Sequence, residues 1–172
     1  MAPSQLAGIG VLLLTVLSPA PCCHVPQDLT AGRELRQVVT HTPRLRILIV
    51  EDNQTDADLM VMALKRAGYE PDWHRVDTEE AYLKALDSEL DLILSDLEMP
   101  VFHGARALEL LRSRGLEMPF VVVSGAADED TCVRLIQSGA ADCLSKDNLT
   151  NLGRVVQHAL DAYQEERKRS PG

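Results

Sequence analysis

Ile47-Leu48-Ile49-Val50-Glu51-Asp52 decides the fold, because an apolar run rich in β-branched residues ends here in two carboxylates. Short runs of this kind are typical of strands that are buried on both faces of a parallel sheet. Three later apolar runs also end in polar side chains, at Asp96, Ser124 and Lys146. The carboxyl ends of parallel strands share one edge of an open α/β sheet, and ligands bind in the crevice there. We therefore expect these polar side chains to converge in one pocket.

Strand-like and helix-like segments alternate regularly from Arg44 onward. The expected strands are residues 45–50, 70–76, 92–94, 120–123 and 141–144. The expected helices are residues 55–67, 78–86, 105–114 and 128–138, and a last one that begins near Asp147 or Asn148 and runs to Tyr163. Strands separated by helices of this length predict an α/β fold with a parallel sheet and helices on both faces.

The composition suits one globular domain with extensions, since the 172 residues are 45% hydrophobic and 25% charged. The formal net charge is −9. Residues 1–43 contain two arginines and two acidic residues, so the whole excess of negative charge falls on residues 44–172. An acidic domain repels a phosphate backbone, and direct nucleic-acid binding is therefore not expected.

Residues 6–17 form a continuous apolar run near the N-terminus. The run resembles the core of a signal peptide, but Met1–Gln5 carries no Lys or Arg, and Pro21 before Cys22 does not fit a lipid-attachment site. A helix of this length spans about 18 Å, less than the ~30 Å hydrocarbon core of a bilayer. Export remains the alternative. We expect residues 1–43 to be a poorly ordered extension, and the domain to be cytoplasmic with no membrane partner.

The four cysteines, Cys22, Cys23, Cys132 and Cys143, show no metal-ligand spacing such as C-x-x-C. Two of them lie in the extension, and the other two lie within expected elements of the domain. We therefore expect ordinary reduced thiols, in keeping with a cytosolic setting.

The pocket predicted at the strand ends is acidic enough to need a cation. Two carboxylates about 4 Å apart repel by about 4 kcal/mol at an effective dielectric constant of about 20. Glu51, Asp52 and Asp96 must therefore take up protons or share a cation. Oxygen ligands that leave room for water and a phosphate suit Mg²⁺ best and Mn²⁺ next. The hydroxyl of Ser124 and the ammonium of Lys146 would complete a site for a phosphoryl group.

Four segments, in order, resemble the receiver domain of two-component response regulators over residues 44–163. These segments are Ile47–Asn53, Asp91–Pro100 together with Gly104, Val121–Ala126, and Gly139–Lys146. The resemblance implies a flavodoxin-like, doubly wound fold with five parallel strands in the order 2-1-3-4-5. Residues 1–43 would precede this domain, and residues 164–172 would be the end of the last helix and a tail.

The resemblance also implies an acceptor and a metal site. Asp96 would accept a phosphoryl group from a phosphohistidine on a sensor histidine kinase or phosphotransfer protein, and so carry a 4-aspartylphosphate. Asp52 and Asp96 would bind Mg²⁺ directly, together with the backbone carbonyl of Glu98. Glu51 would act on the ion through water.

Two further residues would contact the phosphoryl group itself. The resemblance implies that Lys146 pairs first with the Asp96 carboxylate and then with the phosphoryl oxygens. Ser124 would hydrogen-bond the phosphoryl group after transfer. These roles agree with the chemistry, because phosphoryl transfer depends mainly on positioning and on neutralisation of charge.

Three positions depart from the pattern of the family. Cys143 stands where the family usually has an aromatic residue that couples phosphorylation to the output face, so activation would rely on residues 124–130. Asp147 replaces the usual proline after Lys146 and is predicted to cap the last helix. Glu98 adds a carboxylate near the phosphoryl site and is predicted to change the lifetime of the phosphorylated state.

The leading interpretation is a phosphorylation-dependent protein-binding switch, not an enzyme, whose downstream target is unknown and which could form a homodimer. One alternative is a pseudo-receiver that binds partners without phosphorylation. A second is a phosphohydrolase with an aspartyl nucleophile, although such enzymes generally show D-x-D where this chain has Asp96-Leu97-Glu98. A flavin-binding protein is disfavoured, because Glu51 and Asp52 would repel the flavin phosphate.

Overall fold

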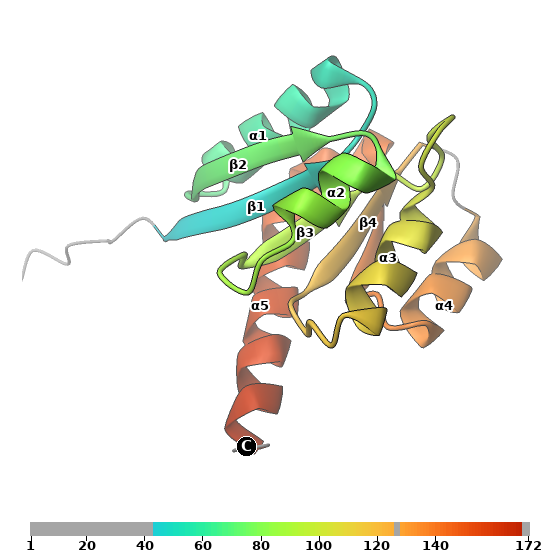
Figure 1. The fold of residues 1–172 in the computed structure, drawn as a ribbon. Coiled ribbons are helices and arrows are strands. Elements are labelled where there is room, and N and C mark those ends of the chain that lie inside the picture. Colours follow the sequence, from blue (N-terminus) through green and yellow to red (C-terminus); the bar gives the residue numbers. More distant parts are fainter. Residues whose placement is uncertain (1–42, 126–127, 170–172) are drawn as a thin grey trace, which may run out of the picture. The chain divides into compact units, whose positions relative to one another are not determined.

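Five parallel strands form one sheet in the order β2-β1-β3-β4-β5. The strands are β1 (Arg44–Val50), β2 (Glu70–Val76), β3 (Leu92–Ser95), β4 (Phe120–Ser124) and β5 (Asp142–Ser145). The helices are α1 (Gln54–Arg66), α2 (Glu79–Ala85), α3 (Gly104–Ser113), α4 (Glu129–Gln137) and α5 (Leu152–Arg169), and a 3-10 helix, η1 (Lys146–Asn151), precedes α5. The computed structural model describes residues 43–125 and 128–169 (Figure 1). The predicted flavodoxin-like strand order is confirmed.

Alternate residues of each strand point to opposite faces of the sheet and build two apolar cores. Ile47 of β1 faces one core, which contains Leu64 of α1 and side chains of α5. Leu48 faces the other core, which contains Leu108 of α3 and side chains of α2 and α4. In Figure 1, α2 and α3 lie in front of the sheet and α5 lies behind it. Both faces are therefore covered, which explains why β3, β4 and the second half of β1 are nearly continuous apolar runs, whereas the edge strand β2 carries polar residues.

Side-chain caps begin three of the helices just after the loops that leave the sheet. Asn53 Oδ1 accepts a hydrogen bond from the Thr55 N–H at 2.9 Å and caps α1. Thr78 caps α2 and Asp128 caps α4 by accepting from backbone N–H groups in the same way. These caps satisfy donors that have no partner inside the helix. They fix where each helix starts relative to the edge of the sheet.

Asp147 does not cap the last helix, so that prediction was wrong. Residues 146–151 form η1, and α5 begins only at Leu152. Ser145 is the capping residue, because its Oγ accepts from the Asp147 N–H at 3.2 Å. Asn148 has φ −119° and ψ 34°, which is not helical, and this residue separates the turn after β5 from the regular helix.

Cys132 and Cys143 form a disulfide, contrary to the prediction of reduced thiols. Cys132 lies on α4 and Cys143 on β5, and their Cα atoms are 5.6 Å apart, a separation that a disulfide spans without movement of the backbone. Cys143 points to the α4 side of the sheet, whereas Leu144 points to the α1–α5 side. The sequence did not indicate this pairing, since the tertiary packing of α4 on β5 creates it.

The N-terminal extension up to residue 42 lies outside the described residues, together with Cys22, Cys23 and the apolar run at 6–17. The expectations for that segment therefore stay predictions. Within residues 43–125 and 128–169, no helix combines the length and the apolar character that a membrane crossing requires.

Candidate functional site

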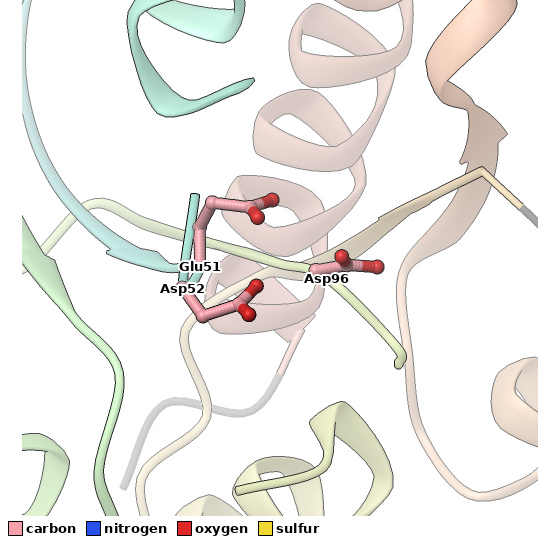
Figure 2. Close-up of side chains that lie close together, drawn as sticks. All are labelled: Glu51, Asp52 and Asp96. Carbon is pink, nitrogen blue, oxygen red and sulfur yellow. The ribbon is translucent and has the colours of Figure 1, made fainter. Parts of the chain in front are cut away.

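Three carboxylates meet at the carboxyl edge of the sheet. Glu51 and Asp52 follow β1 and Asp96 follows β3, and one oxygen from each carboxylate lies within 4.8 Å of the other two (Figure 2). Strand pairing fixes this arrangement, because the Asp96 N–H donates to the Val50 carbonyl at 2.8 Å. Glu51 and Asp96 are buried, whereas Asp52 is exposed. The cluster is therefore desolvated on one side and open to water on the other.

Lys146 lies against this cluster and contacts three carboxylates. Its Nζ is 2.8 Å from Glu51 Oε2, 2.7 Å from Asp56 Oδ2 and 2.8 Å from Asp96 Oδ2. It donates hydrogen bonds to Asp56 and Asp96. Burial acts against the charge of Lys146, but the three carboxylates outweigh it and raise the pKa of the ammonium above its ordinary value. The site therefore holds a permanent positive charge beside Asp96 at neutral pH.

Glu51 contributes a fully buried carboxylate to the cluster. Its Oε1 accepts from the Asn53 N–H at 3.1 Å, and its Oε2 forms the ion pair with Lys146 but has no hydrogen-bond partner among the described residues. Burial raises the pKa of Glu51, although Lys146 and the Asn53 amide act in the opposite direction. Such an oxygen keeps acceptor capacity for a water or a cation. The donor set of this pocket thus fits a small divalent cation.

Asp96 is held in place through both its side chain and its backbone. Its Oδ1 accepts from the Glu98 N–H at 3.3 Å, and its carbonyl accepts from Ser95 Oγ at 2.9 Å. The side chain of Glu98 itself is exposed. The structure therefore places Glu98 beside Asp96 through its backbone, with its own carboxylate in solvent.

Ser124 occupies the corresponding position at the end of β4 and is 2% exposed. The strand register aligns it with Ser145 on β5, the residue before Lys146. The hydroxyl at the end of β4 and the ammonium just after β5 therefore lie at the same edge of the sheet as the carboxylates. The topology thus brings together all five residue positions at which the sequence placed the pocket.

Gly104 allows the loop after β3 to fold closely over Asp96. A Cβ atom at this position would lie 2.3 Å from the Asp96 carbonyl oxygen and 2.9 Å from Ser95 Oγ. The Gly104 N–H also donates to the Leu97 carbonyl at 3.2 Å. Since carbon and oxygen cannot approach so closely, only glycine fits here without movement of the loop.

Asp56 is the site residue that the sequence analysis missed. It lies in the first turn of α1, and its carboxylate accepts a hydrogen bond from Lys146 Nζ at 2.7 Å. In the sequence, an acidic residue in a first helical turn is explained well enough by the helix dipole. Its position four residues after Asp52, in the first turn of α1, was the only available signal.

Replacing Asp56 with asparagine is expected to lower the free energy of unfolding by about 1–2 kcal/mol, because a half-buried hydrogen bond to a charged group is lost. Urea unfolding at neutral pH measures this change. Asp58→Asn is the matched control, since Asp58 is an exposed residue on the same helix that bonds only Gln54 among the described residues. Equal effects from the two substitutions would contradict a structural role for the Asp56–Lys146 contact.

A model of the response regulator receiver domain matches residues 47–157. The chain belongs to the response regulator receiver domain family. The resemblance predicted from the four sequence segments is thereby confirmed. The domain is the receiver of a two-component system, and the carboxylate cluster lies within the matched region.

Named relatives place this receiver among signalling proteins. Hybrid signal transduction histidine kinase G of Dictyostelium discoideum is 34% identical over 112 residues, which are 63% of this chain and 3% of that protein. Two-component system protein A of Emericella nidulans is 32% identical over 123 residues, which are 70% of this chain and 18% of that protein. The receiver thus spans less than a fifth of the length of either curated relative.

A solved structure agrees with the receiver fold. The CheY-like response regulator receiver domain protein from Methanospirillum hungatei JF-1 has a TM-score of 0.59 and 28% sequence identity. The match covers 71% of this chain and 98% of that chain. A receiver domain on its own therefore accounts for nearly all of that solved chain.

Proposed function

We propose that this receiver takes a phosphoryl group onto Asp96 from a phosphohistidine of a sensor kinase or phosphotransfer protein. The observation that carries the proposal is the Lys146 ammonium, which lies 2.8 Å from Asp96 Oδ2 at the open, acidic edge of the sheet. A carboxylate beside a fixed positive charge can receive a phosphoryl group whose oxygens need that charge. Phosphoryl transfer depends on such positioning more than on additional covalent chemistry.

The metal of the site would be Mg²⁺, and Mn²⁺ could replace it. We propose that Asp52 and Asp96 bind the ion directly, together with the Glu98 backbone carbonyl, and that Glu51 holds it through water. The support is the cluster of three carboxylates that place one oxygen each within 4.8 Å of the others, one of which, Glu51, is fully buried. When bound, the ion would neutralise charge on the phosphoryl oxygens.

Asp96 would react first, and Lys146 and Ser124 would then bind the transferred group. An Asp96 oxygen attacks the phosphorus, the bond from phosphorus to the donor imidazole breaks, and an acyl phosphate forms on Asp96. Lys146 pairs with the new phosphoryl oxygens, and Ser124 hydrogen-bonds to them. The added negative charge draws both side chains toward Asp96, so the segments after β4 and β5 change their preferred positions.

The output of this step would be protein binding and not catalytic turnover. An acyl phosphate is labile, which suits a reversible switch. We propose that α4, β5 and α5 form the surface that a downstream protein, or a second copy of this chain, recognises after phosphorylation. We place the domain in the cytoplasm, where histidine kinases obtain their phosphoryl groups from nucleotides, and expect neither nucleic acid nor membrane as a direct partner.

The experiment that tests this function is incubation of the protein with a small acyl phosphate, with and without Mg²⁺, followed by intact mass. We expect one phosphoryl group per chain when Mg²⁺ is present and none after the metal is removed with a chelator. Absence of the adduct under both conditions would favour a pseudo-receiver. Continuous release of phosphate from many ester substrates would favour a phosphohydrolase.

Replacing Glu98 with glutamine is expected to lengthen the half-life of the phosphorylated state by about two- to fivefold. An exposed carboxylate two residues from Asp96 repels the phosphoryl group and can orient water, and such exposed charges contribute about 0.5–1 kcal/mol. Decay of the adduct by intact mass measures the half-life. Glu117→Gln, at an exposed position before β4, is the control. Identical half-lives in all three proteins would remove Glu98 from the mechanism.

A further inference from the structure

The Cys132–Cys143 disulfide joins α4 to β5 close to the proposed phosphorylation site. Cys143 lies three residues before Lys146, and the strand register places it opposite Val122, two residues before Ser124. The disulfide therefore attaches α4 to the pair of strands that end in the two phosphoryl-contacting side chains. The covalent link therefore limits how far α4 can move relative to β5.

Few other contacts hold α4 against the sheet. Within α4, whose residues are all described, Leu135 is the one buried residue, while Val133 and Ile136 are 47% and 46% exposed. By contrast, α3 buries several residues, including Leu108 and Leu111. An element with so little buried apolar surface separates from its neighbours at low cost in free energy. The state of the disulfide therefore decides how freely α4 can move.

The disulfide is also placed so that it can be made and broken. Cys132 and Cys143 are both half-buried residues, and neither is enclosed in the core. In the cytoplasm, where the proposed function places the domain, thiols are kept reduced, and disulfides are usually transient. In that compartment a disulfide that forms and breaks reversibly is expected, and a permanent structural disulfide is not.

We propose that Cys132 and Cys143 form a reversible thiol–disulfide site, which reacts with small dithiols and disulfides and controls whether α4 responds to phosphorylation of Asp96. This inference rests on the proposed function. In the disulfide form α4 stays fixed to β5 and cannot follow the segment after Ser124. In the dithiol form α4 is released and can respond. The site therefore makes the output of the receiver depend on the reducing state of its surroundings.

The exchange reaction needs no group of the protein other than the two cysteines, because a small dithiol or disulfide is the other reactant. In reduction, one thiolate of a dithiol attacks a cysteine sulfur, the S–S bond breaks, and the other cysteine leaves as a thiolate and takes up a proton. The second thiol of the reductant then displaces the first cysteine and closes a cyclic disulfide. In oxidation, the two cysteines give two electrons and two protons to a small disulfide, which leaves as two thiols.

The test measures hydrogen exchange of the α4 amides in the oxidised and reduced forms of the full chain. Cys22 and Cys23 are replaced by serine, so that only Cys132 and Cys143 react. Each form is examined with Mg²⁺ alone and with Mg²⁺ plus a small acyl phosphate, and intact mass with alkylation reports the adduct and the free thiols. Phosphorylation is expected to change the exchange rates of α4 about fivefold or more in the dithiol form, and less than about twofold in the disulfide form.

A matched variant separates redox control from a simple structural contribution. Cys132→Ser in the same background cannot form the bond, so it should respond to phosphorylation as the dithiol form does, whatever the redox treatment. Equal responses of the oxidised and reduced parent, with the adduct present in both, would overturn the proposal while the proposed function stands. The proposal would also be overturned if the two thiols of the parent were still free after treatment with the oxidant. Absence of the adduct in both forms would overturn the proposed function and this coupling together.

Discussion

Replacing Lys146 with glutamine is expected to slow phosphorylation of Asp96 by about 10²–10³-fold, the loss that follows removal of one preorganised group that stabilises developing charge. Glutamine keeps a polar side chain of similar length but removes the ammonium that lies 2.8 Å from Asp96 Oδ2. The initial rate of adduct formation, by intact mass at fixed acyl phosphate and Mg²⁺, measures the effect. Lys65→Gln, an exposed lysine in the last turn of α1, is the control.

The same substitution is expected to lower the free energy of unfolding by about 3 kcal/mol without Mg²⁺, because the buried carboxylates lose their cationic partner. Added Mg²⁺ should raise the unfolding midpoint of Lys146→Gln more than that of the parent, since the ion then replaces the positive charge that Glu51 and Asp96 have lost. An unchanged rate of phosphorylation, in a variant that is folded, would contradict the role of Lys146.

Replacing Gly104 with alanine is expected to lower the free energy of unfolding by about 3 kcal/mol, at the upper end of the usual cost of overpacking. The new Cβ would lie 2.3 Å from the Asp96 carbonyl oxygen, and a backbone atom cannot move aside as a flexible side chain can. The loop after β3 must then shift, so the Asp96 carboxylate should also lose its position and accept the phosphoryl group more slowly. Urea unfolding and the rate of adduct formation measure the two effects.

Gly125→Ala is the matched control for this prediction. A Cβ at Gly125 would have Lys146 Cδ as its nearest neighbour, at 4.0 Å, which is an ordinary contact. Its unfolding free energy should therefore stay within about 0.5 kcal/mol of the parent. If both glycine variants were equally stable, the close approach of Gly104 to Asp96 would not be a constraint on the fold.

The strand ends and the positions of the site residues were predictable because the signals are local. A run such as Ile47–Val50, which is apolar at every position, indicates a strand that is covered on both faces. Strands of this kind are typical of parallel sheets. Once the sheet is parallel, its topology brings Glu51, Asp96, Ser124 and Lys146 to one edge, whatever their separation in the chain. The fold therefore followed from short segments, and the site followed from the fold.

Two of the features that were missed depend on contacts between different elements of the fold, which no local pattern contains. Asp56 looks like an ordinary residue of a first helical turn until η1 places Lys146 against it. Cys132 pairs with Cys143 only because α4 packs on the face of the sheet to which Cys143 of β5 points. The prediction that Asp147 caps the last helix was wrong because Ser145, one residue before Lys146, is the capping residue. The first two contacts join different elements of the fold, whereas Ser145 lies only two residues before the Asp147 N–H that it accepts from.

Intact mass of the parent and of Asp96→Asn, after incubation with a small acyl phosphate and Mg²⁺, tests whether Asp96 carries the phosphoryl group. The variant keeps the size of the side chain but lacks the nucleophilic carboxylate. We expect one phosphoryl group on the parent and none on Asp96→Asn. An adduct of equal yield on both proteins would show that a residue other than Asp96 accepts the phosphoryl group.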